Sequence, residues 1–286
     1  MAHHFLDGEI PNETPENATF HVIPVPLEAS VSYGSGAAQG PAAIIEASTQ
    51  LELWTGSSVP AASGIHTADP IDCSRGIQKT LDAIEDAAAY AAECEAVPLV
   101  LGGEHTVTLG ALRGLKQTYG RFGVVQFDAH ADLRNTYDGS PFSHACVMRR
   151  AVDDLKLPIF QIGVRALCQE EAEYRQENEI PHLDARALYL KGLPKQVLPA
   201  DFPDRIYITF DVDGLDPSVI SATGTPVPGG IGWHDTLTLL ERIVKGKTVI
   251  GADVVELAPT ADSRASEFAA AQLAYLMMGY SLPATD

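Results

Sequence analysis

The stretch Phe122-Gly-Val-Val-Gln-Phe-Asp-Ala-His-Ala-Asp132 joins a short apolar run directly to three potential metal ligands. Most residues of the run are β-branched or aromatic, and charge follows at once, which predicts a buried strand that ends at Phe127. Alternate side chains at a strand end point the same way. We therefore expect Asp128, His130 and Asp132 to converge at the carboxyl end of this strand.

Apolar runs of strand length alternate along the chain with stretches that have the periodicity of helices. The predicted strands are Phe20–Val25, Pro98–Leu101, Phe122–Phe127, Ile159–Val164, Ile206–Phe210 and Thr248–Val254. The predicted helices are Gly40–Leu51, Ile77–Glu93, Thr106–Thr118, Leu167–Glu177, Trp233–Val244 and Arg264–Tyr280. This alternation indicates an α/β fold with a mostly parallel sheet that helices cover on both faces.

The chain of 286 residues has no repeat, low-complexity tract or linker, and single α/β domains of this size are common. We expect one domain over residues 19–286. The polar segment before it predicts a mobile N-terminal arm over residues 1–18.

Composition describes an ordinary soluble globular protein, with 45% hydrophobic and 20% charged residues. The formal net charge of −19 argues against binding to nucleic acid or to an anionic membrane, and would attract cationic substrates and metal ions. The most apolar stretch, Phe268 to Tyr280, is too short to span a bilayer, and the N-terminus has no signal-like core. We expect the protein in the cytoplasm.

Two further clusters of potential ligands follow predicted strands. His105 comes after Pro-Leu-Val-Leu-Gly-Gly, and Asp211 and Asp213 come after Ile-Tyr-Ile-Thr-Phe. Open α/β sheets build their sites at the carboxyl ends of strands. Gly102 and Gly103 would let the backbone turn sharply and bring His105 beside the other ligands.

Two imidazoles and four carboxylates suit two divalent cations held close together, and such a pair generates hydroxide from water at neutral pH. Taken alone, His105 has an ordinary explanation as a helix-entry residue, and Asp211 and Asp213 as capping or turn residues. The Asp-x-His-x-Asp run is harder to explain, because clustered like charges destabilise a fold unless something positive compensates. Three convergent clusters together favour a metal site.

Four motifs stand in order along the chain: Gly102-Gly-Glu-His105, Phe127-Asp-Ala-His-Ala-Asp-Leu-Arg134, Phe210-Asp-Val-Asp-Gly-Leu-Asp-Pro217 and Thr223-Gly-Thr-Pro-Val-Pro-Gly-Gly230. Three more segments extend the pattern across nearly the whole chain: Pro26 to Ser48, Gln161-Ile-Gly-Val-Arg165 and Ala252-Asp-Val-Val-Glu-Leu-Ala-Pro259. Together they resemble the ureohydrolase family of arginases and agmatinases. The resemblance implies a three-layer αβα arginase-like fold, two Mn²⁺ per subunit, and hydrolysis of a guanidinium group to urea and an amine.

The resemblance also implies residue roles. The metal ligands would be His105, Asp128, His130, Asp132, Asp211 and Asp213. Of these, Asp128 and Asp213 occupy bridging positions. Glu256 would bind the guanidinium group, and His144 would carry a proton to the leaving amine. Asp216 would support the second metal cluster through hydrogen bonds.

The chain departs from the family pattern at two places. Thr106 stands where a serine commonly follows the first ligand, and Ser221-Ala-Thr replaces the more usual Pro-Gly-Thr. Neither change removes a ligand, so we expect both to bear on substrate details more than on the chemistry.

Several segments, among them Tyr33-Gly-Ser-Gly and the loop from Leu133 to Ser143, look more like agmatinases than arginases. The expected reaction is agmatine plus water to putrescine plus urea. Arg134 leaves other substrates open, because it could pair with a substrate carboxylate or with a neighbouring acid. The alternatives are therefore guanidinobutyrate, arginine and guanidine.

Two interpretations from other classes also stay open: a deacylase with one catalytic zinc, and a noncatalytic regulatory relative. The resemblance further suggests a homotrimer or homohexamer.

Overall fold

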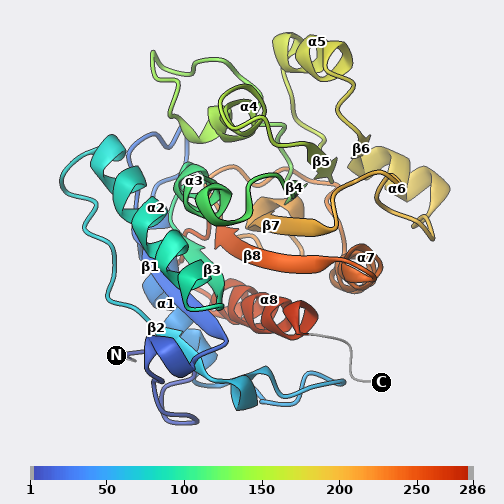
Figure 1. Ribbon diagram of the computed structural model, residues 1–286. Coiled ribbons are helices and arrows are strands. Elements are labelled where there is room, and N and C mark those ends of the chain that lie inside the picture. The colour runs from blue at the N-terminus through green and yellow to red at the C-terminus, as the bar shows by residue number, and fades with distance from the viewer. Residues whose placement is uncertain (1–2, 283–286) are drawn as a thin grey trace.

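The computed structural model describes residues 3–282, and within them one sheet of parallel strands crosses the molecule (Figure 1). The strand order is β2-β1-β3-β8-β7-β4-β5-β6, and each pair of neighbours is parallel. The strands are β1 (Phe20–Val25), β2 (Ile65–Thr67), β3 (Val97–Gly102), β4 (Gly123–Phe127), β5 (Ile159–Ile162), β6 (His182–Leu183), β7 (Arg205–Asp211) and β8 (Thr248–Val255). The predicted parallel sheet is confirmed, and β2 and β6 are two short edge strands that the sequence did not predict.

Helices connect these strands or, in the case of α8, follow the last one. They are α1 (Gly40–Ser48), α2 (Ile77–Glu93), α3 (Val107–Tyr119), α4 (Val147–Asp153), α5 (Gln169–Glu177), α6 (Ala185–Lys191), α7 (Trp233–Val244) and α8 (Ala265–Ser281). The six predicted helices are present, with ends that differ by three residues or fewer. Among the α-helices of residues 3–282, α4 and α6, of seven residues each, were not expected.

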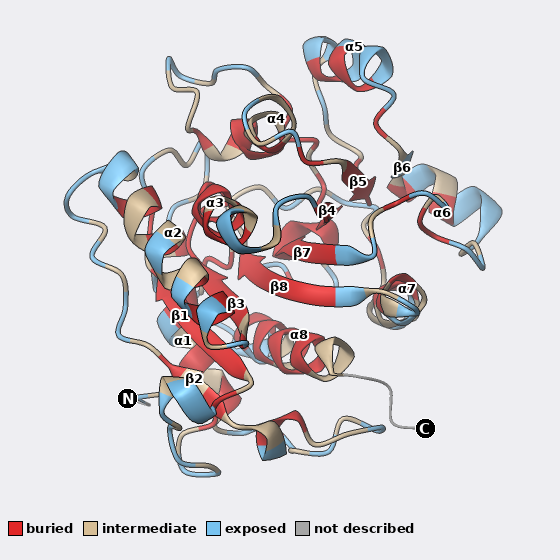
Figure 2. Ribbon diagram, viewed as in Figure 1, coloured by how far each residue is buried: buried red, intermediate tan, exposed pale blue. Residues whose placement is uncertain are grey.

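Two apolar clusters place these helices on opposite faces of the sheet. One cluster joins α1, α7 and α8 to the sheet through residues such as Ile44, Leu240 and Tyr275. The other joins α2, α3 and α4 to it through residues such as Ile84 and Leu112. Figure 2 shows the central strands buried and the outer sides of α2 and α5 exposed. The three-layer αβα arrangement is therefore confirmed.

The N-terminal segment differs from the expected mobile arm, because its described part is docked on the domain. Phe5 and Leu6 are fully buried in the cluster beside α1 and α8. The Leu6 amide donates to Ser48 Oγ at 2.8 Å, and the Phe5 amide donates to Thr67 Oγ1 at 3.0 Å. Burying two large side chains stabilises this docking. Residues 1–2 of the expected arm and 283–286 of the expected domain lie outside the described residues.

The four central strands lie side by side in the order β3-β8-β7-β4, and their carboxyl ends form one edge. His105 follows β3, Glu256 follows β8, Asp211 ends β7, and Asp128 follows β4. Residues far apart in sequence therefore meet above the middle of the sheet, where parallel α/β proteins place their sites.

Candidate metal centre

Two overlapping groups of side chains could each hold a metal ion. One consists of His105, Asp128 and Asp132, and the other of Asp128, His130 and Asp213. Within each group the potential ligand atoms all lie within 4.8 Å of one another. Asp128 belongs to both, which suits a carboxylate shared by two ions. Asp211 belongs to neither group, but its Oδ2 lies 3.6 Å from His105 Nδ1.

The surroundings of His105 Nδ1 have the geometry of a cation-binding site. Its Nδ1 lies 2.9 Å from Asp132 Oδ2 and 3.2 Å from Asp128 Oδ2, yet this buried atom makes no hydrogen bond of normal geometry. Atoms that converge on a common point without bonding to each other fit ligands around an ion. Gly103 permits the placement, because a Cβ there would lie 2.0 Å from Leu27 O.

The second group is arranged in the same way. His130 Nδ1 lies 3.0 Å from Asp213 Oδ2 and 3.6 Å from Asp128 Oδ1. Backbone amides orient the carboxylates: Asp213 Oδ1 accepts from Ala129 at 2.9 Å, and Asp128 Oδ1 accepts from His130 at 2.6 Å. Two carboxylates and one imidazole converge here from the ends of β4 and β7.

The electrostatics show that the site needs positive charge. Burial, together with Asp213 and Asp128, raises the pKa of Asp211 well above its usual value. Burial and the nearby Asp128 raise the pKa of Asp132 to about 6. Burial lowers the pKa of His130, but hydrogen bonds to Asp128 and Asp213 outweigh it and raise this pKa to about 11. Divalent cations would supply the positive charge that favours the ionised form of these crowded carboxyls.

A buried carboxylate outside the cluster orients His105. His105 Nε2 lies 2.8 Å from Thr209 Oγ1, and Thr209 donates its single hydroxyl proton to Asp253 Oδ1, also at 2.8 Å. Thr209 must then accept from His105 Nε2, so the Nδ1 lone pair is left to face the carboxylates. Sequence reasoning did not predict this role for Asp253. The available signal was an acid inside the apolar run of β8.

Arg165, three residues after β5, holds the loops around the second group together, and this role was also missed. Its Nη2 donates to Asp213 O at 2.6 Å and to Val227 O at 2.8 Å. Further donations reach the carbonyl oxygens of Gly163, Gly214 and Leu215. One guanidinium thereby satisfies carbonyls from the β5–α5 connection and from two parts of the β7–α7 connection. Its position directly after the predicted strand Ile159–Val164 was the signal that could have found it.

The predicted role of Asp216 needs correction. Its Oδ1 accepts from the Ser218 amide and hydroxyl, and its Oδ2 accepts from Gly229 and Gly230 amides at 3.0 Å. None of these hydrogen bonds reaches a member of the two groups. A short carboxylate that begins a turn satisfies the nearest backbone donors first. Asp216 therefore shapes the loop that approaches the site.

A cavity of about 430 Å³ opens above the two groups. His130, Asp132, Asp211 and Asp213 line its floor, and the remaining predicted site residues in its lining are Arg134, His144 and Glu256. The structure therefore brings the predicted catalytic and binding residues together around one space.

Two of the cavity's lining residues, Glu256 and Arg134, have defined surroundings. Glu256 Oε1 accepts from the His105 amide at 2.6 Å, and burial raises the pKa of this carboxyl to about 8. Its φ of 65° is left-handed backbone, which is unusual for glutamate and common at functional sites. The Arg134 guanidinium stacks 5.0 Å from the Tyr137 ring. Arg134 is thus held at the wall.

The two departures from the family pattern have different surroundings. Thr106 Oγ1 donates to Phe142 O at 3.1 Å, so it touches the loop that carries His144. The amides of Ser221 and Ala222 each lie 3.3 Å from Ser266 Oγ, which anchors that segment on the start of α8. The first departure is close to the site, and the second acts on the scaffold.

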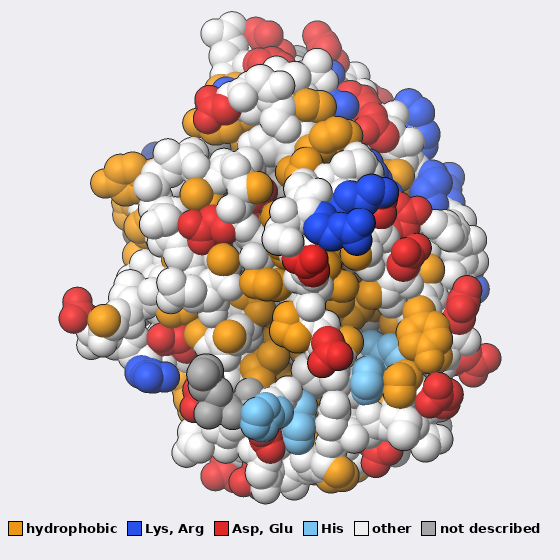
Figure 3. All heavy atoms as spheres, turned by 90° about the vertical axis from the view of Figure 1, so that its left-hand side faces the viewer, with side chains coloured by type: hydrophobic (Ala, Val, Ile, Leu, Met, Phe, Trp, Pro, Cys, Tyr) orange, Lys and Arg blue, Asp and Glu red, His pale blue; other side chains and the backbone are white. Residues whose placement is uncertain are grey.

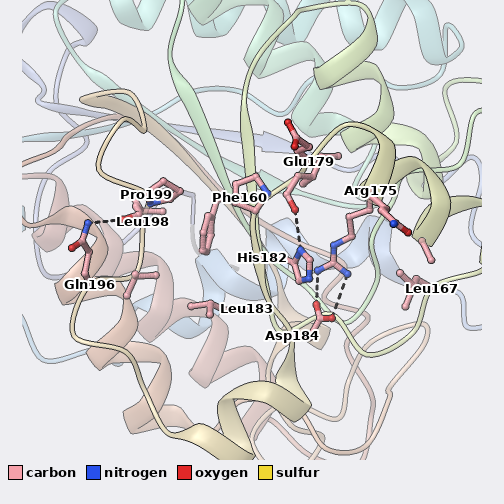
Figure 4. A pocket seen from close by; sticks show the side chains of 15 residues that line it. Phe160, Leu167, Arg175, Glu179, His182, Leu183, Asp184, Gln196, Leu198 and Pro199 are labelled. Carbon is pink, nitrogen blue, oxygen red and sulfur yellow. Dashed lines mark hydrogen bonds and ion pairs between the residues drawn. The ribbon is translucent and has the colours of Figure 1, made fainter.

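A second depression, of about 990 Å³, lies between α5, β6 and residues 196–199 (Figure 4). Phe160, Leu183 and Leu198 form apolar parts of its wall, and an Arg175–Asp184 ion pair forms a polar part. None of the predicted site residues lines it. The cavity above the metal-capable groups is therefore the candidate site.

Comparisons with known proteins agree with this geometry. A model of the arginase family matches residues 18–279. The chain is 38% identical to the N(1)-aminopropylagmatine ureohydrolase of Synechocystis sp., over 96% of this chain and 93% of the relative. It is 31% identical to the agmatinase of Pyrococcus horikoshii, over 96% of each.

A solved structure supports the same relationship. The agmatine ureohydrolase of Thermoplasma volcanium matches with a TM-score of 0.85 and 30% identity, over 94% of this chain and 92% of that one. This similarity confirms the predicted arginase-like fold. By sequence and by structure, the chain is a member of the arginase family.

Proposed function

We propose that the protein hydrolyses the guanidinium group of agmatine, with putrescine and urea as products. The observation that carries this proposal is the position of Glu256, a half-buried carboxylate that shares a cavity with two metal-capable groups. A guanidinium is a planar fork of donors, and a carboxylate at a fixed place is its natural complement. The catalytic domain would be the single unit of residues 19–286.

Two Mn²⁺ ions are the proposed cofactors, although other divalent metals suit the same donors. The proposed ligands are His105, Asp128, His130, Asp132, Asp211 and Asp213. Their mixture of imidazole nitrogen and carboxylate oxygen fits Mn²⁺ better than a soft metal. When bound, such ions make water nucleophilic at neutral pH. This donor set also speaks against a deacylase with one zinc.

The chain's own residues would place the substrate and move its protons. Glu256 would hold the guanidinium with its central carbon above the ligand cluster, since both face the same cavity. His144 on the cavity wall would give a proton to the leaving amine, a role for which imidazole is the commonest side chain. Neither step requires a side chain from outside the cavity.

The acidic cavity favours substrates with a second positive charge, because negative walls concentrate cations. Agmatine has such a charge at its far end. N(1)-aminopropylagmatine is a second candidate, since relatives 38% and 34% identical to this chain are named for it. Arg134 is the single Lys or Arg in the cavity lining, and it would favour the carboxylates of arginine or 4-guanidinobutyrate instead.

We propose that the protein works in the cytoplasm as a homotrimer or homohexamer, without nucleic acid or membrane partners. Among residues 3–282, every helix is too short or too polar to cross a bilayer. On the face shown in Figure 3, acidic side chains are scattered and basic ones gather in a few places. A net charge of −19 supports the absence of anionic partners.

The test is urea release by the manganese-loaded protein, with a chelated control. Agmatine, N(1)-aminopropylagmatine, arginine, 4-guanidinobutyrate and guanidine are compared side by side. Manganese-dependent release that is fastest with agmatine supports the proposal. Faster release from the aminopropyl compound selects the second candidate, and no release from any of the five rejects the function.

A further inference from the structure

Ser30 and Glu104 form a chain of hydrogen bonds that ends on His144. Ser30 Oγ lies 2.9 Å from Glu104 Oε1 and 3.1 Å from His144 Nδ1. The His144 amide also donates to Ser30 Oγ, at 3.0 Å. These residues come from the loop after β1, the turn after β3 and the loop after β4, so the fold brings three distant segments to one imidazole.

Glu104 is an unusual residue at this position, because its carboxylate is fully buried and has no Lys or Arg partner among the described residues. Its Oε2 accepts from the Ala29 and Ser30 amides, both at 2.6 Å. With the Ser30 hydroxyl, three donors point at this carboxylate. A buried carboxylate needs such donors, and it fixes the direction of each.

The donors and acceptors in this series of hydrogen bonds determine which tautomer neutral His144 adopts. The Ser30 hydroxyl has one proton and two lone pairs. Its proton goes to Glu104, because a carboxylate is the stronger acceptor and the contact is the shorter one. Both lone pairs then accept from His144, one from the amide and one from Nδ1–H. Neutral His144 therefore carries its proton on Nδ1, and its Nε2 lone pair is free.

Other contacts agree with this assignment. Ser143 Oγ is farther from His144 Nδ1, at 3.4 Å, so it competes weakly. Among the described residues no hydrogen bond to His144 Nε2 is present, and the side chain lines the candidate cavity. Thr106 Oγ1 donates to Phe142 O and fastens the same loop. Both neighbours of His105 thus hold the loop of His144.

We propose that Ser30 and Glu104 are positioning residues that set the tautomer of His144, so that its free Nε2 first takes up a proton from water in the cavity and then gives that proton to the leaving amine. The proposal rests on the function proposed above for its kinetic consequence, but not for the tautomer itself. Thr106 supports the same arrangement by holding the backbone at Phe142.

Kinetics of the manganese-loaded enzyme give the first test. Ser30→Ala removes the acceptor of Nδ1–H, and we expect kcat for urea release to fall about 10- to 100-fold, within the range of general acid–base effects. KM and bound manganese are expected to stay unchanged. Ser30→Thr keeps the hydroxyl and should retain kcat within about threefold. Ser35→Ala, in the same loop and exposed, is the matched control and should behave as wild type.

Glu104→Gln gives a sharper test, because it reverses the direction of the hydrogen bonds that run between residue 104, Ser30 and His144. The amide oxygen can accept from the two backbone amides, and its NH₂ then faces Ser30. Ser30 must accept from that NH₂ and donate to His144 Nδ1. We expect the opposite tautomer, with the proton on Nε2, and a lower kcat in a folded protein that still binds manganese.

Nitrogen NMR of protein with labelled histidines reports the tautomer of His144, and this measurement does not depend on catalytic activity. His144 is identified by comparison with His144→Gln, at alkaline pH and with a diamagnetic divalent ion in place of manganese. The proposal requires Nδ1–H in wild type and Nε2–H in Glu104→Gln. It is overturned if wild type shows Nε2–H, or if Ser30→Ala keeps wild-type kcat. If wild type releases no urea, the proposed function fails, and the NMR result alone decides the tautomer.

Discussion

Glu256 Oε1 accepts a hydrogen bond from the backbone amide of His105 at 2.6 Å, which ties the end of β8 to the turn after β3. The residue proposed to bind the guanidinium group is thereby held at a fixed position relative to a proposed metal ligand. Because the contact uses the His105 backbone, its side chain is free to serve the metal. The two roles can therefore be separated by mutation.

Glu256→Gln is expected to lower kcat/KM about 100-fold while both metal ions stay bound. The amide oxygen can still accept from His105 N, but the charge that pairs with the guanidinium is lost, and hydrogen bonds to charged groups are worth about 1.5–3 kcal/mol. Steady-state kinetics and metal analysis of the same preparation check this. Glu173→Gln, at an exposed position on α5, is the control. Unchanged catalytic efficiency in Glu256→Gln would remove the residue from the binding role.

Thr209→Val is expected to weaken metal binding about 10- to 100-fold. Loss of a side chain that hydrogen-bonds to a metal ligand usually has an effect of this size. The substitution preserves shape and removes the acceptor of His105 Nε2–H. Thr236→Val is a matched control, because Thr236 is equally buried and its Oγ1 has no hydrogen bond. Calorimetric titration with Mn²⁺ measures the metal affinity of both variants. Equal affinities in the two variants would contradict the orienting role of Thr209.

Metal-free protein is expected to lose stability as the pH rises from about 5 to about 8. Burial raises the pKa of Glu256 from 4.5 to about 8, and burial with Asp128 raises that of Asp132 from 3.8 to about 6. A carboxyl with a raised folded-state pKa binds its proton more tightly when folded, so its contribution to stability falls through this window.

Thermal unfolding across this pH range, with chelator and with excess Mn²⁺, makes the comparison. Bound cations should remove the decline, and Glu256→Gln should flatten the metal-free curve. A metal-free protein whose Tm rises steadily from pH 5 to pH 8 would be inconsistent with the crowded carboxylates described above.

Arg134→Gln tests whether the cavity prefers substrates that end in a carboxylate or substrates that end in a positive charge. If Arg134 pairs with substrate carboxylates, the variant should lose about tenfold in kcat/KM for 4-guanidinobutyrate or arginine, in line with one charged hydrogen bond. Release from agmatine should stay the same or improve, because a positive charge leaves the wall. The ratio of the two rates is the measurement. An unchanged ratio would mean that Arg134 only packs against Tyr137.

Local patterns were sufficient to predict much of this site. Asp128, His130 and Asp132 follow one buried strand at alternate positions, and the parallel sheet brings the other clusters to the same edge. The same patterns located the six longer strands. Strands β2 and β6 have three and two residues, which is too short for any periodicity.

What the sequence could not show depends on contacts between distant segments. Ser30 and His144 are 114 positions apart, and the role of Ser30 exists only because two loops meet. Arg165 and Asp253 are single charged residues whose partners lie elsewhere in the sequence: loop carbonyls for Arg165, and residues of α3 and β7 for Asp253. The docking of the N-terminal segment rests on one apolar pair, Phe5 and Leu6, which no pattern marks as buried. Such roles follow from tertiary packing.

Titration of the metal-free protein with Mn²⁺ tests the central claim most directly, with bound metal and urea release from agmatine measured at each step. The two overlapping ligand groups predict that activity develops as the bound metal approaches about two ions per chain. Asp128→Ala, which removes the residue common to both groups, should fail to reach that stoichiometry and should release almost no urea. Full activity without metal, or full metal and full activity in Asp128→Ala, would contradict the account.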